Sequence, residues 1–335
     1  MAKSTAKSTA KATAKPTLAL VGGQTLLGRE IREHALDFDV LPMDTTDDEG
    51  KTLVRDSDDL ALMSPVDRKV IVAAAIVMLA GDLESTAKVR KMRATDLIDL
   101  TGILEVDPTS RLRSPLSESP TTQASAPVEV IAHPAATMLA LFLRSLEAVA
   151  PITRSVVNLY HPASEFGTAG ITELQQQTVA LLSFQKVPRK IFDTQAAFAM
   201  LARLGDESAH KLEKIEARIE RNLTSLLRGE VPLPSLRLSQ APAFHGLSAS
   251  VWIEFDQTPD LPRITEMLTK AGLDVRGADL EPPSNVGMAN QDGVAVGAIE
   301  ADRNHPRAAW FWLAADNHRL TAQNAILVAR ERIKA

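Results

Sequence analysis

Short apolar stretches alternate with helical periodicity along the first third of the chain. A helical pattern begins at Arg29 and continues to Leu36, and a second one covers 82–93. Buried strands separated by helices favour an α/β fold with a doubly wound, mostly parallel sheet. The strands that we expect lie at 17–21, 37–44, 68–76, 94–102 and 128–134, and a Ser/Thr/Pro-rich surface loop is expected at 107–127.

The pattern changes from Thr153 onwards, where strands flank helices and indicate a second, α+β domain. The expected strands are 155–166 and 248–255, with a hairpin over 294–316. Helices are expected at 168–184, 207–227, 260–272 and 318–335. On the second of these helices the charged residues Glu213, Lys214, Glu216 and Glu220 predict a solvated face.

Composition narrows the class of protein. The chain has 335 residues, of which 45% are hydrophobic, a size that suggests two domains. No apolar run approaches the roughly 20 residues that span a bilayer, so we expect no membrane insertion. The absence of cysteine excludes disulfides, thiolate metal sites and cysteine nucleophiles, and we expect a cytoplasmic protein.

The first 16 residues repeat a short unit of alanine, lysine and small polar residues. Four lysines are their only charges, and the segment lacks the apolar region of a signal peptide. We predict a disordered basic tail over 1–16. A solubilising extension is favoured over a nucleic-acid contact, because four lysines add little affinity at physiological salt, and no specific nucleic-acid partner is expected.

A glycine turn joins the first strand to the first helix. Gly22, Gly23 and Gly28 lie where a dinucleotide fingerprint has its glycines, but Thr25 occupies the middle position. Its β-branched side chain crowds the approach of a pyrophosphate. Nucleotide binding and a purely structural turn therefore both remain open.

The remaining chemical signals are weak. The seven histidines, at 34, 133, 161, 210, 245, 305 and 318, show no metal-ligand spacing, so no metal site is predicted. Neither a glycine-lysine phosphate loop nor a Gly-x-Ser-x-Gly elbow is present.

From about Thr17 to its end the chain resembles the aspartate-semialdehyde dehydrogenase family. The segments that carry the resemblance are the glycine turn, "VVNLYHPASEFGTAGITELQQQT", "APAFHGLSASVWIEF" and "WFWLAADNHRLTAQNAILVAR", in which Ala315-Asp316-Asn317 is the most specific match. The resemblance implies a Rossmann-type dinucleotide-binding-like domain of 17–135 plus 317–335. It also implies an α+β dimerisation domain over 136–316, and hence a homodimer through that second domain.

The resemblance places the family's nucleophilic cysteine in an Asn-Pro-x-Cys turn, which reads His133-Pro134-Ala135-Ala136 here. Ala136 therefore stands in the place of the cysteine. A methyl group cannot attack an aldehyde, and the neighbouring Thr137 is an unactivated alcohol that we expect to support the helix start.

Other positions of the family pattern have changed as well. The substrate-orienting glutamine falls on His161, the carboxylate-binding arginine on Gln240 and the acid/base histidine on Leu247. His245 is two residues away, which on a strand displaces a side chain by more than about 6 Å, too far for it to serve as the base. The family's substrate-contacting glutamate matches either Glu216 or Glu220.

The cofactor region reads "MDTTDDEG", with Asp44, Asp47, Asp48 and Glu49. Acidic groups repel a 2′-phosphate, whereas an aspartate at the end of the second strand accepts from a free ribose hydroxyl. No cofactor is certain, and NAD is preferred over NADP if one binds, with Asp44 as the ribose ligand. A solvated acidic loop is the alternative.

Two classes of function follow. The favoured one is a non-catalytic, dimeric binding or regulatory protein on a dehydrogenase fold, with a protein partner or a small-molecule ligand left open. The alternative is an active NAD(P)-dependent oxidoreductase that acts on a semialdehyde through a rearranged site. Loss of nucleophile, acid/base and arginine together favours the first, because each supplies a separate catalytic contribution.

Overall fold

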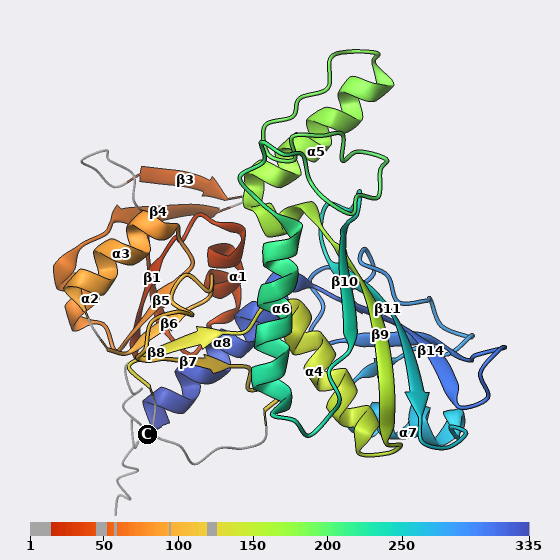
Figure 1. The fold of residues 1–335 in the computed structure, drawn as a ribbon. Coiled ribbons are helices and arrows are strands. Elements are labelled where there is room, and N and C mark those ends of the chain that lie inside the picture. The colour runs from red at the N-terminus through yellow and green to blue at the C-terminus, as the bar shows by residue number, and fades with distance from the viewer. Residues whose placement is uncertain (1–14, 45–51, 57–58, 94, 119–125, 335) are drawn as a thin grey trace, which may run out of the picture.

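Two sheets and the helices packed on them form the protein (Figure 1). The computed structural model describes residues 15–44, 52–56, 59–93, 95–118 and 126–334. Most of the basic tail and the acidic residues Asp47, Asp48 and Glu49 lie outside the described residues. Among the described helices, none combines the length and apolar character needed to cross a membrane.

The first sheet has eight strands in the order β3-β4-β2-β1-β5-β6-β8-β7. All neighbouring pairs are parallel except β3 with β4. This confirms the expected α/β class with a mostly parallel sheet. The strands are β1 (Thr17–Val21), β2 (Asp39–Asp44), β3 (Thr52–Asp56), β4 (Asp59–Pro65), β5 (Ile76–Leu79), β6 (Leu97–Asp99), β7 (Ser110–Arg113) and β8 (Val128–Ile131).

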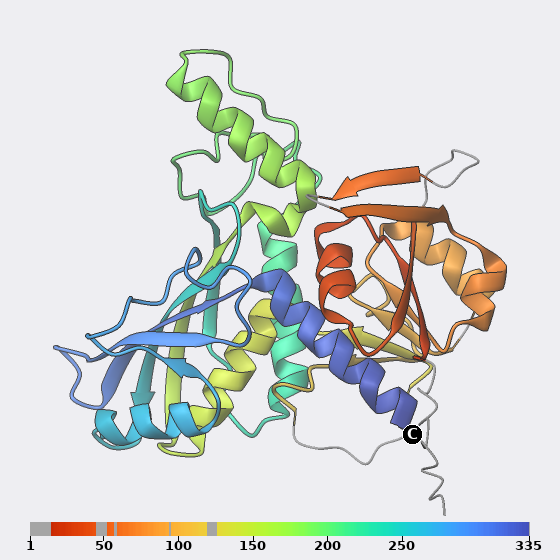
Figure 2. The same cartoon turned by 180° about the vertical axis from the view of Figure 1, so that it is seen from behind.

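Helices cover both faces of this sheet, which explains why its inner strands β1, β5, β6 and β8 are buried. On β1, Leu18 and Leu20 pack against α1 (Leu26–His34) and α8 (Asn317–Lys334). The alternate residues Ala19 and Val21 pack on the side of α2 (Arg68–Ala73) and α3 (Leu83–Met92). Figure 2 shows α8, the last helix of the chain, lying beside the first strands and helix.

Two predictions for this sheet were wrong. Residues 68–76 do not form one strand: Arg68–Ala73 is a helix, whose Lys69 N–H donates to the Asp67 side chain at 2.8 Å, and the strand begins only at Ile76. The expected loop 107–127 contains the edge strand β7, which pairs with β8. Arg111 of β7 donates to the buried Glu129 of β8, so charged side chains concealed a strand. The pattern also failed to indicate β3 and β4.

The second sheet has six strands in the order β10-β9-β11-β14-β13-β12. Its helices α4 (Pro134–Glu147), α6 (Leu212–Leu227) and α7 (Leu261–Lys270) pack in one core with the sheet, where Phe142 of α4 meets Phe311 of β14 with ring centroids 5.2 Å apart. The expected α+β character and the β13–β14 hairpin are confirmed. The strands are β9 (Ile152–His161), β10 (Ser235–Gln240), β11 (Leu247–Phe255), β12 (Asp274–Val275), β13 (Ala295–Ala301) and β14 (Ala308–Ala315).

One further unit follows β9. A short 3-10 helix, η1 (Ala163–Phe166), leads into α5 (Gly167–Leu182), which projects away from both sheets (Figure 1). The buried Glu173 of α5 accepts the backbone N–H groups of Lys190, Ile191 and Phe192, so it holds the returning segment in place.

Candidate functional site

A cleft of about 510 Å³ lies where the two halves of the molecule meet. The ends of several strands and the starts of several helices border this cleft, and ligands bind at such places in open α/β sheets. Its lining includes Thr25 before α1, Gly81 after β5, His133 before α4, Glu165 of η1, Arg218 of α6 and His318 of α8.

The glycine turn forms one wall of this cleft. Gly22 has φ +87°, and a Cβ at this position would clash with the backbone of Ala80 and Gly81. A Cβ on Gly28 would clash with the carbonyl oxygen of Gly22. Both glycines are therefore required by the packing of the turn itself, whether or not a nucleotide binds.

Thr25 is the N-cap of α1. Its Oγ1 accepts from the N–H of Gly28 at 3.0 Å and donates to the carbonyl of Gly22 at 2.8 Å. The N–H groups of Gly22 and Gly23 both donate to the carbonyl of Met43. Several donors that a phosphate would need in this turn thus have partners within the protein. Asp44 ends β2, next to Met43, as the sequence predicted.

The turn before α4 lacks a nucleophile where the family resemblance places one. Ala136 lies in the first turn of α4 and is fully buried in the apolar core. Thr137 is also buried, and its Oγ1 lies 2.9 Å from Oγ of Ser114, away from the residues that line the cleft. The expectation that Thr137 supports the helix start was wrong, because the side chain that caps α4 is His133 and the Thr137 hydroxyl contacts Ser114 instead.

His133 is the N-cap of α4. Its Nδ1 accepts the N–H of Ala135 at 3.2 Å, and its own N–H donates to Oδ1 of Asn222 on α6 at 2.8 Å. Burial lowers the pKa of the ring well below its ordinary value, with a smaller effect from the Arg218 charge.

His161 and Gln240 end the adjacent parallel strands β9 and β10, and the structure brings them together. Nδ1 of His161 lies 3.2 Å from Oε1 of Gln240, whose amide nitrogen donates to the carbonyls of His161 and Ala241. Both side chains are fully buried, and burial lowers the pKa of His161 to about 4.

Leu247 begins β11 and is fully buried. His245 lies just before it, with Nε2 at 2.8 Å from Asp316 Oδ2 and Nδ1 at 3.0 Å from Ser164 Oγ. Burial opposes protonation of this ring, but the hydrogen bond and charge of Asp316 prevail and raise its pKa. Ser164 Oγ is buried and also contacts Asn317, so this chain of polar groups joins β11, η1 and the start of α8.

The predicted solvated face of α6 needs one correction. Glu216 is half-buried, and its Oε2 accepts the N–H of Leu238 at 2.6 Å, so it supports β10. Glu220 is exposed, as predicted. Neither glutamate lines the cleft, whereas Arg218 of the same helix does and pairs with Glu105, its Nε lying 2.5 Å from Oε1.

Sequence reasoning missed Glu165. Its Oε1 accepts from Nδ2 of Asn317 at 2.7 Å, and its Oε2 lies 3.5 Å from Nε2 of His133. Burial raises the pKa of this carboxyl. The available signal was its place directly after β9, near His161, because polar residues at the ends of strands converge on the cleft.

The architecture defines a class of protein, in which a Rossmann-type sheet is joined to an α+β domain. Helix α4, which follows β8 of the first sheet, begins this second domain. The family model of the semialdehyde dehydrogenase dimerisation domain matches residues 143–320. A USG-1 protein homolog of Pseudomonas aeruginosa is 31% identical over 266 residues, which cover 75% of this chain and 76% of the relative. The chain belongs to the semialdehyde dehydrogenase family.

One further relative is similar in sequence, and two solved structures share the fold. An aspartate-semialdehyde dehydrogenase of Rickettsia bellii is 30% identical over 200 residues, 58% of this chain and 59% of that protein. The structure of a probable aspartate-semialdehyde dehydrogenase from Pseudomonas aeruginosa shares the fold, with TM-score 0.82 and 24% identity over 95% of this chain and 99% of that one. Aspartate semialdehyde dehydrogenase II from Vibrio cholerae, complexed with ASA, has TM-score 0.80 and 20% identity over 96% and 99% of the two chains.

Proposed function

We propose that this member of the family has lost the dehydrogenase reaction and acts as a dimeric binding or regulatory protein. The observation that carries the proposal is the start of α4, where Ala136 presents a buried methyl group and the hydroxyl of Thr137 contacts Ser114. Covalent catalysis of an aldehyde oxidation needs a nucleophile at that point. The oxidoreductase alternative would need a nucleophile at a different position.

The changed positions around the cleft support the same proposal. Leu247 has no titratable group, and Gln240 is committed by three hydrogen-bonding contacts to the ends of β9 and β10. A neutral amide cannot replace the bidentate cation that binds a carboxylate. Loss of general acid/base help alone reduces rates by about 10²–10⁴.

A rescue series tests the proposal. Ala136→Cys alone should give no phosphate-dependent oxidation of aspartate semialdehyde with either NAD or NADP. Ala136→Cys combined with Gln240→Arg and Leu247→His is the smallest set in which we expect turnover. Ala135→Cys, a thiol at the adjacent buried position, is the matched control. Turnover by the single Ala136→Cys variant would show that the acid/base and arginine positions are misassigned, and turnover by the parent would contradict the proposal.

Weak or absent dinucleotide binding, with NAD preferred, belongs to the same proposal. Its support is the capping role of Thr25 and the position of Asp44 at the end of β2. Titration calorimetry with both dinucleotides checks it. Micromolar binding of NADP would contradict both the weakness and the preference.

The proposed function also includes a homodimer that forms through the second domain. The face of the six-stranded sheet opposite its helices exposes Val156 and Trp310 and partly exposes Tyr160, Trp252 and Trp312. An apolar face of this kind favours association. Light scattering at micromolar concentration should give twice the chain mass, and a monomeric mass would refute the dimer. A cytoplasmic location and the domain boundaries at 135/136 and 316/317 stay predictions.

A further inference from the structure

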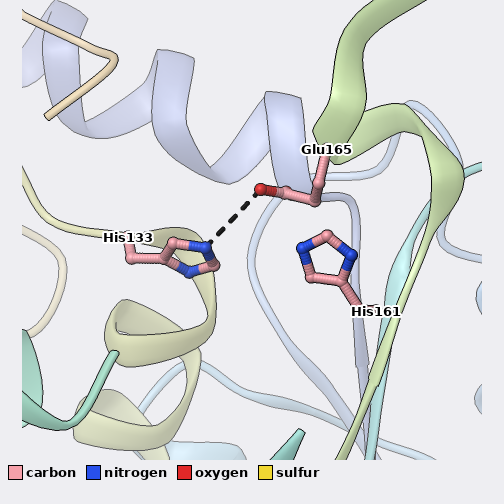
Figure 3. A group of neighbouring side chains, drawn as sticks. All are labelled: His133, His161 and Glu165. Carbon is pink, nitrogen blue, oxygen red and sulfur yellow. Dashed lines mark ion pairs between the residues drawn. The ribbon is translucent and has the colours of Figure 1, made fainter. Parts of the chain in front are cut away.

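Three potential metal ligands meet beside the cleft. His133 comes from the turn before α4, His161 from the end of β9 and Glu165 from η1, and one donor atom from each lies within 4.8 Å of the others (Figure 3). His133 and Glu165 line the cleft, while His161 is fully buried behind them.

His161 offers a nitrogen lone pair to this cluster. The amide nitrogen of Gln240 donates to two backbone carbonyls, at 3.0 and 2.9 Å, so its oxygen must face Nδ1 of His161, which therefore carries the proton. Nε2 is then an acceptor. Within the described residues this buried Nε2 has no hydrogen-bond partner, and Figure 3 shows the ring edge pointing toward His133 and Glu165. Buried polar atoms are normally satisfied, so this one points to a ligand.

We propose that His133, His161 and Glu165 bind a divalent transition-metal ion of the Zn²⁺ class. Two imidazoles and one carboxylate form a common three-residue zinc set, and a fourth position stays open to a water or ligand oxygen. Here that position faces the cleft. Gln240 acts as the outer partner that fixes the orientation and tautomer of His161.

The departures from the family pattern fit this site. By the resemblance, His133 stands where the family has asparagine and His161 where it has glutamine. Both changes replace an amide by an imidazole, and the structure places the two rings together. The chain thus lacks a thiol at this turn and has gained two nitrogen ligands beside it.

The local charge and geometry permit metal binding. Metals bind neutral imidazole, and the hydrogen bonds of both rings leave one nitrogen of each ring without a proton. The nearby cation Arg218 is paired with Glu105. Donor atoms around a tetrahedral zinc ion lie roughly 3.3 Å apart for bonds of about 2.0–2.1 Å. His133 Nε2 and Glu165 Oε2 are already 3.5 Å apart, and the donor atoms of the three residues lie within 4.8 Å of one another, so binding requires His161 and this pair to approach by up to about 1.5 Å.

One rearrangement accompanies binding. Nδ1 of His133 accepts the N–H of Ala135, which puts the ring proton on Nε2. A metal on Nε2 requires that proton to move to Nδ1, so the number of protons is unchanged and the contact with Ala135 is given up. This loss is small beside the free energy of a three-ligand metal site, and we expect micromolar affinity.

The experiment uses the full chain after treatment with a chelator. Co²⁺ is titrated as the probe, and both the visible d–d absorption and calorimetry are recorded. We expect one ion per chain and the absorption typical of four- or five-coordinate Co²⁺. Zn²⁺ should displace it and raise the Tm of the parent, because an ion that binds only the native state stabilises it.

The variants restore the amides of the family pattern. His133→Asn and His161→Gln should each weaken Co²⁺ binding by at least about 10–100-fold, because loss of a residue that only orients a metal ligand already costs this much. The double variant should lose the Zn²⁺-dependent rise in Tm. Two controls should leave binding unchanged: His210→Gln, in the same cleft, and His34→Gln, which belongs to a second cluster with Glu30 and Glu33 on α1.

The proposal is overturned if the parent binds no ion, if the double variant binds Co²⁺ as tightly as the parent, or if His34→Gln or His210→Gln abolishes binding. Unfolding of each variant in chelator identifies any that fail to fold, and Glu165→Gln then tests the same site from η1. The outcome is separate from the proposed loss of dehydrogenase activity, since a chain that binds metal and still oxidises semialdehydes would refute only the latter.

Discussion

The turn before α1 and the turn before α4 are built alike but constrain their residues differently. Each turn joins a strand to a helix, and both helices start at the same cleft. The N-cap side chain is Thr25 in the first turn and His133 in the second. In the first turn Gly22 and Gly28 are fixed by backbone crowding. In the second turn, the fold requires only that the residue at position 136 fit a buried space in the core.

The difference shows which positions report function. Gly22 would persist in this fold even without a nucleotide, so the glycine turn alone is weak support for a cofactor. Ala136 is different, because a cysteine side chain is only one sulfur atom larger and the family resemblance places one there. The methyl group at this position is therefore a stronger basis for the proposed loss of chemistry than the glycines are for a cofactor.

The largest expected loss of stability comes from a substitution in the turn before α1. Gly22→Ala should destabilise the protein by roughly 3–4 kcal/mol, because it adds left-handed backbone strain to a clash with Ala80 and Gly81. Denaturant unfolding measures the change. Gly272→Ala is the matched control, since its φ of +88° is nearly the same but nothing lies within 4 Å of the added Cβ. Equal losses in the two variants would refute the crowding argument.

The second prediction concerns the polar link between β11 and α8. His245→Asn should cost roughly 2 kcal/mol at pH 6, because it removes a charged hydrogen bond from the buried Asp316. The folded-state pKa of His245 is raised, so this contribution is complete below the unfolded pKa of about 6.5 and disappears as pH rises through the folded-state value. The loss should therefore be smaller at pH 9.

A double-mutant cycle provides the control. In an Asp316→Asn background the effect of His245→Asn should lose this alkaline decline, because the raised pKa depends on Asp316. Burial raises the pKa of Asp316, but the hydrogen bond and charge of His245 together with the N–H groups of Arg319 and Asn290 lower it overall, so the contribution of Asp316 is lost only as pH falls through its folded-state value. An effect of His245→Asn that is independent of pH in both backgrounds would contradict the account.

The smallest effect on stability sharpens the comparison at Thr25. Thr25→Gly should cost a few tenths of a kcal/mol, the usual loss when glycine replaces a threonine cap. It should also strengthen dinucleotide binding, because it frees the Gly28 N–H and the space beside it. Calorimetry with NAD and NADP checks this, with Thr101→Ser, elsewhere in the cleft, as the control. No gain in affinity would show that Thr25 does not limit binding.

The sequence was sufficient for the parts of the fold where local pattern and burial agree. The β1–α1 turn and the final helix follow from apolar periodicity. The run 68–76 could not be divided from its pattern alone, because Val70, Ile71 and Val72 are apolar in either structure and the helix depends on the cap at Asp67. The pattern did not predict β7, because the charge of Arg111 is compensated only by its hydrogen bond to Glu129 on the neighbouring strand.

The site was predictable only in part. The family resemblance predicts that Ala136, His161, Gln240 and Leu247 are the changed site positions, which stays a prediction, and the structure adds that His161 and Gln240 contact each other. The meeting of His133, His161 and Glu165 depends on how two turns and η1 converge at the cleft, which no spacing along the chain encodes.

The most direct test of the central claim is a single-turnover experiment on the unmodified chain. Protein is mixed in excess over aspartate semialdehyde with saturating NAD or NADP and phosphate, and the absorbance of reduced nicotinamide is followed. We predict no signal above a mixture without protein, because Ala136 cannot form the covalent intermediate. A burst of reduced nicotinamide stoichiometric with the semialdehyde would contradict the account.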